Sequence, residues 1–207
     1  MHREDAVMLA HAVLALSLVV RVYDNVGIAA KEMESALAAA HAVLADAGIA
    51  VTWRECPREA CQDLGPLAPA EIVVRVIAAP PASLPDSLGF SLVDVERRAG
   101  TLATVFTDRV NALSALAGTE SGQLLGRAMA HEIGHLLLGT THHADRGLMR
   151  GLWTTSDLKK EQPWDWVLSR EDGARVRRGL AARLRRPEQP AATSPTSRQH
   201  SGRVPLS

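Results

Sequence analysis

The sequence contains few aromatic residues, few cysteines and no excess of either charge. Aromatic residues make up 3% of the 207 residues, so leucine, valine, isoleucine and alanine must build the core. Lysine plus arginine equals aspartate plus glutamate, at 23 each, which argues against a nucleic-acid-binding protein, since such proteins usually carry a basic excess. No uninterrupted apolar run is long enough for a stable membrane span. The length suits one domain with a real core and a flexible end.

Only two cysteines are present, Cys56 and Cys61, in the stretch "CPREAC". A zinc site built on them would need two more cysteine or histidine ligands nearby, and there are none. The spacing allows a small disulfide loop in an oxidising compartment. The alternative is a pair of free thiols.

The N-terminus resembles an export signal in part. Residues 6–20, "AVMLAHAVLALSLVV", have the length of a signal-peptide core, and "AHA" offers a cleavage site. Only Arg3 precedes this run as a firm positive charge, and Glu4 and Asp5 oppose it. We predict that residues 1–17 are a signal peptide or N-terminal extension and that the protein is exported, to the periplasm or the outside. The alternative is a helix of the mature chain that runs into a strand. A disulfide and export would support each other, but they are not independent predictions.

Hydrophobic periodicity predicts an α/β domain over residues 18–186, followed by a disordered Pro/Ser-rich tail at 187–207. An initial strand, helix and strand predict a crossover unit with parallel strands. Thr119 is a candidate N-cap, and Gly48 and Gly139 are candidate helix ends. The predicted strands are 18–24, 49–53, 71–78, 88–95 and 101–110, and the predicted helices are 29–47, 119–138 and 171–186.

The stretch "AMAHEIGHLLLGTTHHADRGLM", at 128–149, contains the pattern HExxH. His131 and His135 are one helical turn apart on the same face, so both rings can bind one zinc ion through neutral nitrogens. Glu132 lies between them and can reach a water on the metal without being a ligand, as a general base would. The alternative is an ordinary buried helix whose two histidines are hydrogen-bonded.

The residues after this helix favour the zinc site. A catalytic zinc needs a third protein ligand and an open position for water. Gly139 lets the backbone turn sharply and bring a residue from beyond the helix back to the metal. Both His142 and His143 follow at a suitable distance, and the residues alone leave the choice between them open.

The run "HEIGHLLLGTTHH…GLM" resembles the metzincin class of zinc peptidases, whose motif is HExxHxxGxxH followed by a methionine turn. It is still more similar to a group of exported bacterial proteins with a histidine four residues after the glycine. In that group the domain opens with a "VRVY" strand, a helix and a "VxW" strand before a cysteine. "VRVYD" and "VTWREC" match these features here. The resemblance spans about residues 18–186 and implies a twisted mixed sheet of about five strands, a crossover helix and an active-site helix.

The motif also departs from the class. Leu138 occupies the usual place of the glycine, which comes one residue later. His142 keeps the glycine-to-histidine spacing of the wider class, whereas His143 matches the closer group and its distance to Met149. An extra helical residue rotates the exit of the chain by about 100°, and on these grounds we favour His143. By resemblance, Met149 would lie beneath the metal without binding it. Some metzincins use a tyrosine after the methionine turn, but the single tyrosine here is Tyr23.

These observations predict a zinc metalloendopeptidase. It would hold one Zn²⁺ per chain on His131, His135 and His143, with Glu132 as the catalytic base. Its substrate would be a peptide or protein. The resemblance to metzincins implies that an extended peptide pairs by strand addition with a strand between residues 88 and 107. We expect a monomer. The alternatives are a non-catalytic zinc-stabilised binding module, which would not need Glu132, and a zinc hydrolase of a non-peptide amide.

Overall fold

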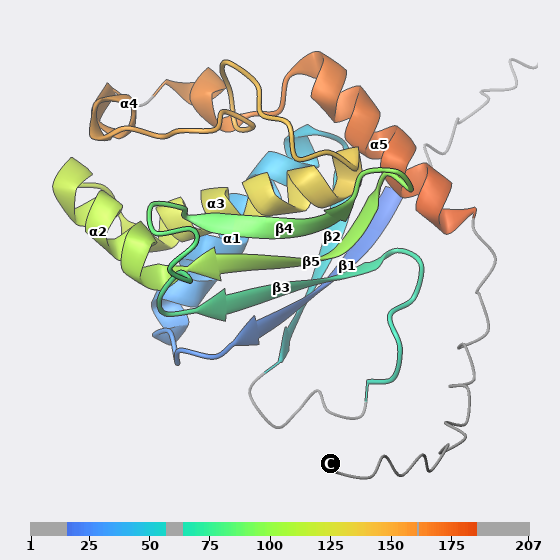
Figure 1. Ribbon diagram of the computed structural model, residues 1–207, viewed down its shortest axis with the longest axis horizontal. Coiled ribbons are helices and arrows are strands. Elements are labelled where there is room, and N and C mark those ends of the chain that lie inside the picture. Colours follow the sequence, from blue (N-terminus) through green and yellow to red (C-terminus); the bar gives the residue numbers. More distant parts are fainter. Residues whose placement is uncertain (1–15, 57–63, 161, 186–207) are drawn as a thin grey trace, which may run out of the picture.

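The computed structural model describes residues 16–56, 64–160 and 162–185, which form one mixed sheet with helices packed on it (Figure 1). The strand order is β2-β1-β3-β5-β4. Three pairings, β2 with β1, β1 with β3 and β3 with β5, are parallel, and β4 runs antiparallel to β5 at one edge. The mixed α/β fold and the parallel crossover predicted for its first strands are therefore confirmed. The strands are β1 (Leu16–Asp24), β2 (Ile49–Cys56), β3 (Glu71–Ile77), β4 (Gly89–Asp94) and β5 (Ala99–Phe106).

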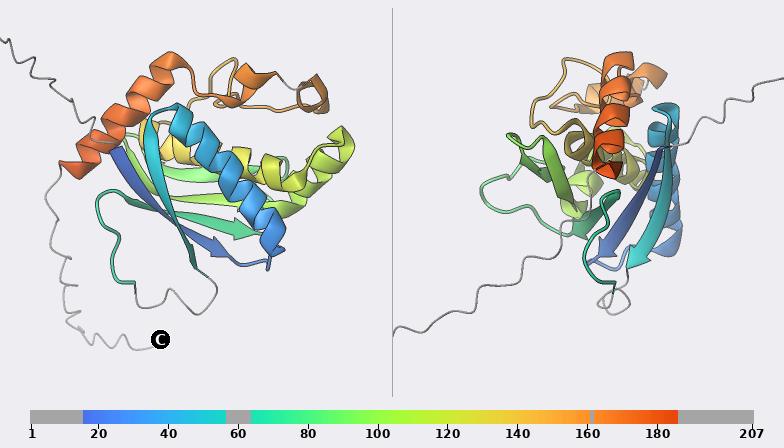
Figure 2. Two further views of the ribbon diagram at one scale, coloured as in Figure 1. Left: turned by 180° about the vertical axis from the view of Figure 1, so that it is seen from behind. Right: turned by 90° about the vertical axis from the view of Figure 1, so that its right-hand side faces the viewer.

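Helix α3 lies at the centre of the described structure. It packs against α1, α5 and the β4–β5 side of the sheet (Figures 1 and 2). A β-carbon at Gly126 would come 2.1 Å from the carbonyl oxygen of Ala36, so α1 and α3 touch almost backbone to backbone. Alternate side chains of β1 point to this core, and its Leu18 and Val20 are fully buried. The helices are α1 (Ala30–Asp46), α2 (Thr107–Ala117), α3 (Ser121–Leu138), α4 (Thr155–Lys160), α5 (Arg170–Leu184) and the 3-10 helix η1 (Pro163–Trp166).

Two local predictions were wrong. The strand predicted to run to residue 110 ends at Phe106, and α2 starts at the next residue. The signals for α2 were Asp108 in its first turn and Gly118, which ends it in the left-handed conformation. Thr119 does not cap α3, which begins at Ser121 without any side-chain cap.

Several sequence predictions fall on residues outside the described ranges. Cys56 is buried at the end of β2, but Cys61 lies outside, so the disulfide stays a prediction. The same holds for the cleavable N-terminal segment and for the disordered tail. Among the described helices, none is long and apolar enough to cross a membrane.

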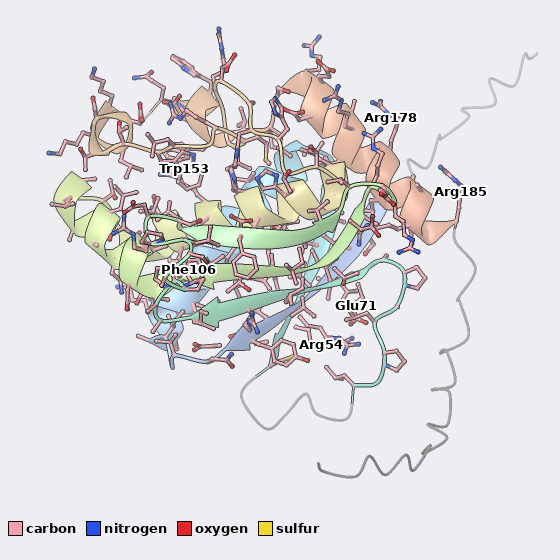
Figure 3. All side chains as sticks on the ribbon, in the orientation of Figure 1. Arg54, Glu71, Phe106, Trp153, Arg178 and Arg185 are labelled. Carbon is pink, nitrogen blue, oxygen red and sulfur yellow. The ribbon has the colours of Figure 1, made fainter. Side chains whose placement is uncertain are left out.

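A buried ion pair joins β1 to β3 on the sheet face away from the core. Nε and Nη2 of Arg21 donate to Oε1 and Oε2 of Glu71 at 2.7 and 2.6 Å, and both side chains are at most 7% exposed. The backbone N–H of Ala68 donates to the same carboxylate at 3.1 Å. Arg54 approaches it from β2 at 3.3 Å, with 47% of its side chain exposed (Figure 3). The hydrogen bonds from Arg21 hold the pKa of Glu71 below its usual value.

Removing one partner of this pair should destabilise the fold. In Arg21→Met the buried carboxylate of Glu71 loses its bidentate donor, and we expect a loss of about 3 kcal/mol in the free energy of unfolding. Arg54→Met should cost less than about 1 kcal/mol, because that pair is half exposed. Urea denaturation at neutral pH measures the free energy of unfolding of both variants. Equal losses would contradict the conclusion that Arg21, rather than Arg54, is the main partner of Glu71.

Candidate metal centre

The three predicted histidines converge on one point of space. His131 and His135 project from successive turns of α3, and the chain returns after Gly139 to bring in His143. One ring nitrogen from each of the three lies within 4.8 Å of the other two. Nε2 of His135 is 3.0 Å from Nε2 of His131 and 3.2 Å from Nε2 of His143.

Hydrogen bonds to the backbone determine which nitrogen of each helical histidine faces this point. Nδ1 of His131 lies 2.7 Å from the carbonyl oxygen of Leu148, and Nδ1 of His135 lies 2.9 Å from that of Thr140. A carbonyl oxygen only accepts, so each Nδ1 must carry the proton and donate. In the neutral rings both Nε2 atoms then present lone pairs. Two lone pairs at 3.0 Å repel each other unless a cation lies between them.

The donor set and spacing fit zinc. A tetrahedral zinc ion with Zn–N bonds of 2.0–2.1 Å places its ligand nitrogens about 3.3 Å apart, close to the two observed separations. Three imidazoles with one vacant position are also a usual donor set of catalytic zinc. The residues present therefore fit the ion that the sequence predicts.

The electrostatic environment keeps these rings neutral. Burial lowers the pKa of His131 to about 3 and the pKa of His135 to about 4, and repulsion from neighbouring histidines adds to both shifts. Burial also lowers the pKa of the more exposed His143, and proximity to His142 adds to the shift. Neutral imidazole is the form that binds a metal.

Of the adjacent histidines His142 and His143, only the second joins the cluster. His143 reaches the other two rings, whereas the exposed His142 is not part of the cluster. The segment that carries His143 is closed by a hydrogen bond from the N–H of Ala144 to the carbonyl oxygen of Met149, at 2.8 Å. A β-carbon at Gly151 would come 3.0 Å from the ring of His143, so any larger residue would press on that ring.

Glu132 is buried beside the cluster and contacts the edge strand. Oε2 of Glu132 lies 2.7 Å from Oγ of Ser91 on β4, and the same hydroxyl lies 2.8 Å from the carbonyl oxygen of Glu132. Burial raises the pKa of Glu132 to about 7, and the bond to Ser91 opposes that shift. No local pattern in the sequence indicates Ser91, because an isolated strand serine does not show that it faces a helix residue 41 positions away.

Met149 and two tryptophans pack around the centre. Met149 is buried, and its Sδ lies 2.6 Å from where a β-carbon at Gly134 would be, so it covers α3 between the two helical histidines. Trp153 is 7% exposed, with its ring centre 5.6 Å from that of His131. Trp166 packs edge-on against Trp153 at 5.2 Å. Trp153 and Trp166 are both buried, whereas Trp164 is 64% exposed.

The histidines and Glu132 open into a cavity of about 630 Å³. One wall is the loop 84–88 with the start of β4, and the other is the segment around Gly151 and Trp153. Apolar side chains, including Leu113 and Leu152, make up much of the lining. Tyr23 is not among the lining residues, so the single tyrosine takes no part in this site.

No protein-family profile and no curated protein matches the chain. Solved structures do share its fold. A zinc-dependent peptidase from Methanocorpusculum labreanum strain Z matches with a TM-score of 0.51 and 14% identity over 76% of this chain and 99% of that one. Archaemetzincin from Methanopyrus kandleri matches with a TM-score of 0.56 and 15% identity over 81% and 98%. Metalloproteinase-II from Bacteroides fragilis gives 0.51 and 16% over 82% of this chain and 55% of that one. At such identities the likeness shows the fold alone.

The geometry predicts which histidine retains zinc. His143→Ala should lose most of its zinc on dialysis, because two imidazoles remain where three converged. His142→Ala removes a neighbouring histidine of the same size outside the cluster and should keep one zinc per chain. Elemental analysis after gel filtration measures both. Zinc loss from the His142 variant alone would make His142 the ligand.

The pKa shifts also predict how the metal-free protein responds to pH. Three groups decide this response, His131, Glu132 and His135. Between about pH 4.5 and 6.5 the unfolded chain protonates the two histidines, whereas the folded chain keeps both rings neutral and protonates Glu132. The unfolded state then binds about one more proton, so stability from this site falls as pH falls through that range. A His131→Leu/His135→Leu variant lacks both of these histidine shifts. As pH falls from 6.5 to 4.5, its free energy of unfolding should therefore fall less than that of the wild type, measured by urea denaturation in chelator. Parallel pH profiles would contradict the shifts.

Proposed function

We propose that the protein is a zinc-dependent metallopeptidase that hydrolyses peptide bonds within its substrates. The observation that carries the proposal is the placement of a buried carboxylate, Glu132, beside three converging imidazoles at the wall of one cavity. A purely structural zinc site would not need that carboxylate, and burying it costs solvation free energy. The three peptidase structures that share the fold support the same conclusion.

His131, His135 and His143 would hold one zinc ion, with the fourth position left to water. When bound, zinc lowers the pKa of that water to about 7 and polarises the carbonyl of the substrate. The hydrogen bonds to the carbonyl oxygens of Thr140 and Leu148 orient two of the rings and strengthen them as ligands.

Glu132 is the proton carrier of the proposed reaction. Its carboxylate takes a proton from the attacking water and passes it to the leaving amine. A pKa near 7 suits both steps, because the group gains and loses a proton at similar cost. The positive charge of a bound cation favours the ionised form, which is the one that acts as base. Ser91 holds Oε2, so the carboxylate is oriented before the substrate arrives.

The edge strand β4 is the proposed binding site for the peptide. It pairs with β5 on one side, its other edge has no partner among the described strands, and its Gly89, Phe90 and Ser91 line the cavity. An extended peptide can add to such an edge through backbone hydrogen bonds. A peptide bound in this way would have its scissile bond next to Glu132. Of the residues 88–107 in which the sequence predicts the pairing strand, we therefore propose β4, at 89–94.

Export remains part of the proposal and rests on the N-terminal sequence and the two cysteines. Mass spectrometry of the N-terminus tests it, on protein recovered from the cells and on protein recovered from the medium. An intact N-terminus on cell-retained protein would contradict it.

Glu132→Gln should separate zinc binding from catalysis. The variant keeps all three imidazoles and should retain one zinc per chain, but lose at least about 100-fold in turnover of a mixed peptide library, because the amide cannot accept the proton. Glu34→Gln, an exposed change on α1, is the matched control and should be fully active. A chelator should abolish activity, and added zinc should restore it.

Two outcomes would contradict the peptidase assignment. If the wild type binds zinc but cleaves no peptide, the three-histidine centre stabilises a binding module. If it cleaves small amides and no peptide, the same chemistry acts on another substrate.

A further inference from the structure

A second hollow, of about 430 Å³, lies between the turn that joins β4 to β5 and helix α5. None of its described lining residues is acidic, although acidic and basic residues are equal in number over the whole chain. Such a local excess of one charge is costly unless solvent or a ligand compensates it. Five of its lining residues are arginines: Arg97, Arg98, Arg175, Arg178 and Arg183.

Three of these arginines already have partners. Arg183 is buried and donates Nη2 to the carbonyl oxygens of Leu136, at 2.8 Å, and of Gly100, which ties α5 to the end of α3 and to β5. Arg97 pairs with an aspartate of its own turn, and Arg175 pairs with acidic residues of its own helix. Those two pairs are largely exposed, so they hold the guanidinium groups only weakly.

Arg98 and Arg178 make no ion pair with any described residue, and both are exposed. Figure 3 shows Arg178 projecting from α5. The two come from segments 80 residues apart in sequence and line one hollow. They are therefore the cations of this hollow that a ligand would meet without first breaking an ion pair.

The backbone at Arg98 does not explain why an arginine is there. Its φ is 49°, and it is the single non-glycine residue with positive φ in the part of the chain that the structure describes. Glycine or asparagine would adopt this conformation at lower cost. The turn is pressed against the end of α3, where a β-carbon at Gly139 would come 2.5 Å from the carbonyl of Arg98. Packing thus requires the conformation, but it does not require the guanidinium.

Compensation of the α3 dipole is the competing explanation. The C-terminal end of a helix favours nearby cations, and Leu137 and Leu138 of α3 line the hollow. Arg183 already fills that role by direct hydrogen bonds to carbonyl oxygens. Arg98 and Arg178 have no such bond to the end of α3, so the dipole leaves their placement unexplained.

We propose that this arginine-lined hollow binds an anion carrying two or more phosphate groups. The guanidinium fork matches phosphate oxygens with paired, charge-assisted hydrogen bonds. A volume of 430 Å³ corresponds to roughly 14 water molecules of about 30 Å³ each, which is room for a small bisphosphate. The same groups can come from a soluble metabolite or from a phospholipid headgroup. The hollow contains none of the clustered histidines, so the proposal does not depend on the peptidase assignment.

The test uses the full zinc-loaded chain and fructose 1,6-bisphosphate as the probe, with fructose as the uncharged control. Isothermal titration at constant ionic strength measures the affinity. Arg98→Gln/Arg178→Gln should weaken binding about tenfold or more, because each change removes charge-assisted hydrogen bonds. Lys31→Gln/Arg170→Gln removes the same charge from exposed positions outside the hollow and should bind like the wild type.

A second variant guards against loss of folding. Arg98→Gly suits the positive φ, so it should melt no lower than the wild type and still bind more weakly. A second binding experiment uses vesicles of phosphatidylcholine, with or without phosphatidic acid, in place of fructose 1,6-bisphosphate. Arginine-dependent binding to the acidic vesicles alone would identify a lipid headgroup as the source.

Two results would overturn the proposal. One is that neither fructose 1,6-bisphosphate nor the phosphatidic acid vesicles bind when the probe is present at millimolar concentration. The other is equal binding by the wild type and the Arg98→Gln/Arg178→Gln variant, which would place the anion elsewhere, at the zinc centre for example.

Discussion

Two hydrogen bonds determine the character of the histidine centre. Nδ1 of His131 and Nδ1 of His135 each donate to a backbone carbonyl oxygen, and both carbonyls belong to the chain that returns after α3. With the protons held there, both Nε2 atoms turn lone pairs toward the same point. The returning segment thus orients the helical histidines as well as contributing His143. Without it, α3 would carry two rotatable imidazoles rather than a preformed site.

The position of α3 explains how three polar side chains, those of His131, Glu132 and His135, can be kept in the core. From Ala128 to Leu138 every residue of α3 is buried, and most are small or aliphatic, so the helix packs closely against α1 and against the β4–β5 side of the sheet. Burial then acts on the few polar side chains left there, lowering the pKa of the histidines and raising that of Glu132. These shifts cost folding free energy in the metal-free protein, and those of the histidines keep both rings in the neutral form that binds a metal.

Much of this arrangement could be predicted from local patterns. HExxH places two rings on one face of a helix whatever surrounds it, and Gly139 does end α3 in the left-handed conformation. The parallel crossover also followed from strand and helix spacing. The error at α2 had a physical cause: "TLATVFTDRV" is rich in β-branched residues, and propensity alone does not show where the last strand residue gives way to a helix. Contacts such as Ser91 with Glu132 join distant segments, and a single sequence does not encode their proximity in any local signal.

The return of the chain between residues 139 and 150 has one more consequence. This segment contributes one proposed ligand and the two carbonyls that orient the others, yet its closure depends on few bonds of its own, such as that from Ala144 to Met149. Any free energy that a cation gains by binding the three rings is therefore also free energy that orders this loop. Affinity for the ion and rigidity of the loop become two measures of one coupled equilibrium.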